Sequence, residues 1–231
     1  MEKDNLKKKL KLDSPEMKKL GESITQYLVT DAVLNFDIDP RGKSEKELHK
    51  EILSYIKYIV TEKPKIEIIV DHRISILKES RRFLKQDKKE FACIFYAIWF
   101  EHWINNLIVI YGKRNRLQQE EIVQIIRESN ARSKFSWILK LLEAPKLMEK
   151  HRLLVLRLFD LRNSYVHYKW KGNVDDEDDK QEKDLINTLG EIENTIKYFN
   201  QYESKYFYHS SKKKIRKLLK LKPNKPLNRT A

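Results

Sequence analysis

The chain has 231 residues, of which 35 % are charged and 40 % hydrophobic, as is usual for a soluble globular protein. Five glycines and six prolines are too few for a turn-rich β-sandwich or β-barrel. The single cysteine, Cys93, excludes a disulfide framework within the chain and indicates a reducing, cytoplasmic compartment. The net charge of +14 lies almost entirely in residues 1–19 and 205–231, and such basic ends favour a phosphate-bearing partner such as RNA.

The first part of the chain, residues 1–71, is interpreted as an N-terminal extension that contains one clear helix. It begins with a lysine-rich stretch, and residues 24–38 are apolar without a clean period, so helix and strand both stay open there. The sequence from Ser44 to Glu47 has the pattern of a capping box, in which the two side chains close the start of a helix. We therefore predict a helix over 44–62, ended by Pro64.

Apolar residues at helical spacing predict an all-α body over residues 72–206. The longest helix has apolar residues over a wide face, which predicts a central position in the core, and Gly112 is expected to end it. Although this helix is long enough to cross a bilayer, Glu101 and neighbouring polar residues make burial in lipid costly, so we expect no integral membrane segment. The expected helices span residues 73–84, 88–111, 118–129, 132–143, 147–170 and 181–206.

Two charged stretches differ from this helical pattern. Residues 173–180 contain five acidic side chains, and their mutual repulsion predicts a solvated loop rather than a metal site. Residues 207–231 form a basic tail, either a disordered chain or an amphipathic helix that touches nucleic acid, a membrane or a partner. The candidate nucleic-acid-binding side chains of the tail are Lys212, Lys213, Lys214, Arg216 and Lys217.

Near the end of the predicted helix 147–170 lies the hexamer RNSYVH, from Arg162 to His167. Asn163 and Ser164 precede His167 by four and three residues and share its helix face, and the long side chain of Arg162 can reach the same groove. Histidine exchanges protons near neutral pH, and the arginine fork matches phosphate oxygens, so these residues suit RNA cleavage without a metal. A polar helix face that only confers solubility would carry the same residue types.

The hexamer resembles the RNxxxH signature of the HEPN superfamily, helical proteins many of which are metal-independent ribonucleases. The order of elements is similar as well. An earlier core helix carries Glu101 with Asn105 and Asn106 among aromatic residues, and a lysine-containing helix like that from Lys134 to Leu142 lies between it and the motif. The resemblance covers residues 72–206 and implies an all-α, HEPN-like helical bundle with an N-terminal extension and basic termini.

The resemblance also implies catalytic roles. His167 would act as acid or base, Arg162 would stabilise the phosphate and Asn163 would orient the reacting groups, with Glu101 and Ser164 as supporting residues. Cleavage would leave a 2′,3′-cyclic phosphate and need no cofactor. HEPN ribonucleases typically dimerise so that two motifs face one cleft, which implies a homodimer that acts on RNA in toxin–antitoxin or antiphage defence, together with an antitoxin or defence-system protein.

An alternative function belongs to a different class. The chain would then be a non-catalytic helical module that binds nucleic acid, or a regulatory or dimerisation module.

Lys169 stands where related toxins often carry a tyrosine that is modified to silence them, so regulation by tyrosine modification is not expected. The remaining histidines lack the spacing of zinc ligands, and no metal site is expected.

Overall fold

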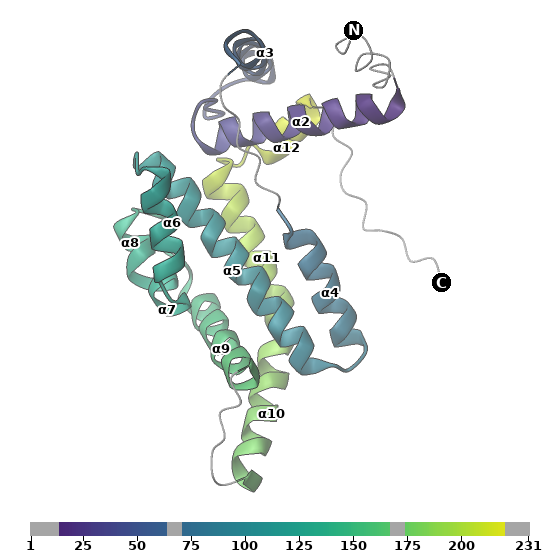
Figure 1. Ribbon diagram of the computed structural model, residues 1–231, viewed down its shortest axis with the longest axis vertical. Helices are drawn as coiled ribbons and strands as arrows, with labels where there is room; N and C mark the ends of the chain where they lie inside the picture. Colours follow the sequence, from purple (N-terminus) through teal and green to yellow (C-terminus); the bar gives the residue numbers. More distant parts are fainter. Residues whose placement is uncertain (1–13, 64–70, 167–173, 220–231) are drawn as a thin grey trace, which may run out of the picture. The chain divides into compact units, whose positions relative to one another are not determined.

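The computed structural model contains only helices and connecting loops in the part of the chain that it describes (Figure 1). The predicted all-α class is confirmed for these residues. The β-branched segment 65–70 and the last residues of the predicted helix 147–170 lie outside them. The described residues are 14–63, 71–166 and 174–219.

Contacts within the chain divide it into two compact units. One unit is formed by residues 67–203, and the other combines residues 1–66 with residues 204–231. The described residues of the N-terminal extension and those at the start of the basic tail therefore belong to one unit, whereas the sequence predicted them as separate segments.

The larger unit is organised around α5, which aromatic side chains bury along most of its length. Phe100 and Trp103 on α5 meet Phe199 of α11 edge to face, with ring centroids 5.1 and 4.4 Å apart. Near its other end, Phe91 stacks on Phe83 of α4 at 5.4 Å. The predicted central position of this helix is confirmed. The helices of this unit are α4 (Arg73–Lys85), α5 (Lys89–Arg114), α6 (Gln119–Glu128), α7 (Ala131–Ser133), α8 (Leu139–Leu141), α9 (Glu149–Val166), α10 (Val174–Gly190) and α11 (Ile192–Tyr202).

Among the described helices, α5 alone is long and apolar enough to cross a membrane by length and composition. Its most apolar window is 56 % buried against the rest of the fold, which is how the core helix of a helical bundle packs.

The predicted end of α5 at Gly112 was wrong, because the helix continues to Arg114. Gly112 allows α6 to pack closely against α5 and does not end the helix. A Cβ atom at this position would lie 2.8 Å from Cγ1 of Ile122, which is buried on α6. The missing side chain therefore lets α6 fold back tightly against α5.

The predicted loop at residues 173–180 was also wrong, because α10 begins at Val174 and includes the acidic run. Acidic residues are favoured in the first turns of a helix, where the exposed N–H groups and the helix dipole carry positive charge. The predicted helix 181–206 in turn divides into α10 and α11, with Gly190 at the break, because glycine weakens a helix interior. Similarly, the predicted helix 132–143 contains a π-helical turn, Lys134–Ile138, between α7 and α8.

The smaller unit contains α2 (Pro15–Leu34), α3 (Glu45–Glu62) and α12 (Lys212–Leu218). The undecided segment 24–38 is helical as far as Leu34, and Ser14 caps its helix by accepting from the amide of Met17. The capping box predicted at Ser44 and Glu47 is confirmed, since each side chain bonds the backbone of the other residue.

Replacing Gly112 by alanine should lower the free energy of unfolding of the larger unit. The added Cβ meets buried Ile122, and such overpacking costs about 1–3 kcal/mol, of which improved helix propensity returns at most about 1 kcal/mol. Gly190→Ala is the matched control, because nothing lies within 4 Å of the Cβ that it would add. Urea unfolding followed by circular dichroism measures both variants. Equal midpoints for the two would show that the close approach of α5 and α6 does not depend on Gly112.

Candidate functional site

The motif lies at the C-terminal end of α9, and Arg162, Asn163 and Ser164 belong to its last turns. His167 directly follows the last helical residue, Val166, and lies outside the described residues. A stripe of buried apolar side chains anchors α9 in the core, and its members include Val155, Leu158 and Leu161. Arg162 lies on the same face as part of this stripe, because it follows Leu158 by one helical turn.

Arg162 and Asn163 form the contact at the centre of the motif. Nη1 of Arg162 donates to Oδ1 of Asn163 at 2.9 Å, and both side chains are half-buried. Among the side chains that the structure describes, no carboxylate forms an ion pair with Arg162. The guanidinium is thus oriented by a neutral amide.

Ser164 has a local backbone partner. Its hydroxyl donates to the carbonyl oxygen of Leu161 at 2.7 Å, within the same helix. Such a bond satisfies a half-buried hydroxyl and leaves its lone pairs as acceptors. Ser164 therefore lies beside Arg162 and Asn163, with its proton directed toward the backbone.

The N-terminal end of α5 underlies the motif. The Cys93 thiol donates to the carbonyl of Leu158 at 3.8 Å, and burial raises its pKa to about 12, with Glu90 adding to the rise and the positive charge of Arg162 opposing it. Burial also raises the pKa of Tyr165 to about 12, with smaller contributions from Cys93 and Glu90. Glu90 and Cys93 were not identified from the sequence, since their proximity to the motif depends on how two helices pair.

Glu101 belongs to a different polar group. It lies eight residues beyond Cys93 on α5, a rise of about 12 Å along the helix. There it acts on Lys134, whose Nζ donates to Oδ1 of Asn105 at 2.9 Å. Burial lowers the pKa of this lysine, and the carboxylate of Glu101 opposes that effect. The structure thus places Glu101 with Asn105 and Lys134, away from Arg162 along the helix axis.

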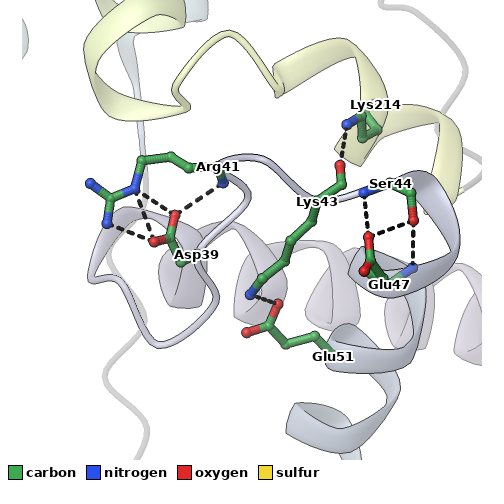
Figure 2. A network of polar contacts seen from close by, with 7 residues as sticks. All are labelled: Asp39, Arg41, Lys43, Ser44, Glu47, Glu51 and Lys214. Carbon is green, nitrogen blue, oxygen red and sulfur yellow. Dashed lines mark hydrogen bonds and ion pairs between the residues drawn. The ribbon is translucent and has the colours of Figure 1, made fainter.

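The basic tail begins as a helix that packs on the N-terminal part of its own unit. Ile215 of α12 is 3 % exposed, and Nζ of Lys214 donates to the carbonyl of Lys43 at 2.7 Å, next to the start of α3 (Figure 2). Lys217 pairs with Glu45 at 2.8 Å. Both lysines therefore have partners within their own unit.

The other candidate lysines and the arginine of the tail differ in their surroundings. The ammonium of Lys212 lies 4.8 Å from the ring centroid of Tyr208. Lys213 and Arg216 are exposed and form no ion pair within the described residues. Of the five predicted nucleic-acid-binding side chains, these two are the ones that project outward without an internal role.

Figure 2 shows that the turn before α3 is itself a dense polar network. The guanidinium of Arg41 donates hydrogen bonds to the carboxylate of Asp39 and lowers the pKa of that carboxyl group to about 2. Lys43 forms an ion pair with Glu51. The carbonyl group of Lys43, which accepts a hydrogen bond from Lys214, lies in this turn, so α12 packs on a segment that side-chain contacts stabilise.

Within the described residues, no group of three or more histidine, cysteine or acidic side chains is arranged to hold a metal ion.

Comparisons of the chain with protein-family models, with curated proteins and with solved structures gave no match.

Cys93 should resist alkylation in the folded protein, because it is fully buried and its pKa is raised to about 12. Iodoacetamide at mildly alkaline pH should leave the native protein unmodified and label it fully in urea, as mass spectrometry would show. Fast labelling of the native protein would contradict the packing of α5 against α9 beneath the motif.

Proposed function

We propose that the protein is a metal-independent endoribonuclease of the HEPN type. The observation that carries this proposal is the state of Arg162: it is half-buried, oriented by Asn163 and without a carboxylate partner among the described side chains. The planar fork of donors of an arginine matches the oxygens of a phosphate, so an arginine that no described carboxylate engages is suited to bind one. The residue that follows the helix, His167, supplies the acid–base group that the reaction requires.

In this mechanism the ribose 2′-oxygen attacks the adjacent phosphorus after losing its proton to a base. The 5′-oxygen of the next nucleotide leaves with a proton from an acid, which gives a 2′,3′-cyclic phosphate and a 5′-hydroxyl. Arg162 stabilises the extra charge on the phosphate oxygens, His167 transfers protons, and Asn163 keeps the guanidinium in place. No step needs a metal ion or a cofactor.

A single motif provides one histidine, while the reaction uses one acid and one base. We therefore propose a two-fold dimer in which two motifs share a cleft, the most common symmetry of small oligomers. Val166, next to His167, is apolar and 44 % exposed, which suits a surface that a second copy covers. By its resemblance, the enzyme would act on cytoplasmic RNA in toxin–antitoxin or antiphage defence, restrained by a partner protein.

Arg162→Ala should lower RNA cleavage by about 10²–10³, because it removes a donor to the charge that develops on phosphate. His167→Ala should lower it by about 10²–10⁴, because it removes the acid–base group. The measurement is cleavage of end-labelled RNA in EDTA, with detection of cyclic-phosphate ends.

Arg157→Ala is the matched control for these two variants, since Arg157 is an exposed arginine on the same helix. Its activity should equal that of the unmodified protein. Cleavage that persists in both motif variants, or that EDTA abolishes, would rule out the proposed mechanism.

The alternative function, a non-catalytic module that binds nucleic acid, is favoured by the outward-facing Lys213 and Arg216. Deleting the whole tail would not test it, because that deletion also removes buried Ile215 and the bond from Lys214 to Lys43. Reversing the two exposed charges leaves these packing contacts intact.

The double variant Lys213→Glu, Arg216→Glu should weaken RNA binding and lower the slope of log affinity against log salt by about one to two, if both residues contact phosphates. Lys46→Glu, Lys50→Glu on α3 makes the same change in net charge at exposed positions and serves as the control. Filter binding at several salt concentrations measures both. Equal losses in the two double variants would indicate general attraction by the whole protein, with no contact specific to α12.

A further inference from the structure

The N-terminal end of α9 carries a second group of polar side chains, unrelated to the hexamer. A surface pocket of about 600 Å³ opens between the first turns of α9 and one face of α11. Its volume falls within the range usual for small-molecule sites. Both helices belong to the larger unit, and the pocket lies eleven residues, or about 16 Å of helix rise, from Arg162. Lining side chains that carry the argument are Lys150, His151, Asn194, Lys197, Tyr198 and Gln201.

His151 is fixed in this pocket from two sides. Its Nδ1 shares a hydrogen bond of 2.9 Å with Oγ1 of Thr195, which is itself buried. Its ring stacks on the ring of Tyr198, with centroids 4.3 Å apart and planes at 13°. Tyr198 is held in turn, because its hydroxyl accepts from the amide of Met148 at 2.7 Å. The imidazole thus has one defined orientation before any ligand arrives.

The second nitrogen of the same ring, Nε2, has no hydrogen-bond partner among the described residues. His151 is 9 % exposed and lines the pocket, yet its Nε2 forms no hydrogen bond within the described residues. Nε2 is not among the buried polar atoms that lack a partner, so it stays accessible to water or to a ligand in the pocket. An imidazole that is rigidly held by Nδ1 and presents Nε2 to a pocket is arranged to bind something there.

The charges around the ring favour an anion. Lys150 and Lys197 line the pocket, are exposed, and form no ion pair within the described residues, while Glu191 is the one acidic side chain in the lining. Asn194 and Gln201 add amide donors from α11. The N-terminal end of α9 contributes the positive end of its dipole. The pocket lining therefore carries more positive than negative charge and several hydrogen-bond donors, which favours an anionic ligand.

We infer that this pocket binds a small phosphorylated molecule of the phosphate-monoester class. The phosphate would accept a hydrogen bond from Nε2 of His151 and lie between the ammonium groups of Lys150 and Lys197. The amides of Asn194 and Gln201 would contact the remainder of the ligand. The site does not depend on ribonuclease activity, so the two proposals succeed or fail separately.

Protonation of His151 gives a direct readout of binding. Burial lowers the pKa of this imidazole, Lys150 lowers it further, and Glu191 raises it; Lys197 and Tyr198 are the other titratable groups in the pocket wall. An anion at Nε2 favours the imidazolium, which donates from both nitrogens. Occupation of the site should therefore raise the pKa of His151, and no other histidine lines this pocket.

The experiment is a titration of the full chain with inorganic phosphate and, separately, with a nucleoside 5′-monophosphate, observed by NMR of the histidine rings. Saturating ligand should raise the pKa of His151. A response to both ligands with similar affinity would define a site for the phosphate group, and tighter binding of the nucleotide would define a nucleotide site. No change in the His151 signals with either ligand would overturn the inference.

A pair of substitutions separates binding from folding. Asparagine at this position can keep the bond to Thr195 but cannot reach the place of Nε2, whereas glutamine can present its amide there. His151→Asn should weaken binding about tenfold, the effect of losing one hydrogen bond to a charged group, and His151→Gln should weaken it less. Lys197→Ala should also weaken binding, while Lys140→Ala, an exposed lysine outside the pocket, should not. Equal effects of the two lysine variants would reduce the result to non-specific attraction and overturn the inference.

Discussion

Burial of α5 is the constraint on which the larger unit depends. Full burial of one large apolar side chain contributes about 1.5–3 kcal/mol, and α5 buries aromatic and aliphatic residues on nearly every side. Each neighbouring helix is positioned by a different part of it. Phe91 packs on α4, and Trp103 packs on α11. The missing side chain of Gly112 allows α6 to approach closely, and Cys93 contacts the turn of α9 that precedes the motif.

The two polar groups on α9 experience opposite ends of one helix dipole. The C-terminal end has a negative potential that favours cations, and Arg162 lies there. Near the N-terminal end, burial and the charge of Lys150 lower the pKa of His151. Under the two proposals, the same helix would present a charged donor at one end and an imidazole at the other.

Local signals in the sequence were reliable where the structure they predict is itself local. The capping box of Ser44 and Glu47 and the periodic helices depend on residues close together in the chain. Gly112 was misread because its meaning comes from Ile122 on another helix. The acidic run was misread because repulsion was weighed without the favourable field of a helix start.

The surroundings of both candidate sites could not be predicted for the same reason. Thr195, which orients His151, is 44 residues away along the chain, and Cys93 is 65 residues from the carbonyl that it contacts near the motif. No periodicity in a single sequence encodes such pairings. Lys214 and Lys43 are 171 residues apart, so the backbone partner of this tail lysine could not be predicted from the sequence either.

The docking of α12 beside α3 has a consequence for biosynthesis. A ribosome releases the residues of α2 and α3 first, but the last helix of their unit emerges only after the whole of residues 67–203 has been made. At the usual elongation rates of about 5–20 residues per second, this delay is on the order of ten seconds. During that interval the apolar surface that later receives Ile215 is uncovered, while the larger unit already has every segment that it needs. The nascent chain therefore acquires the segment bearing the motif before its N-terminal unit can close.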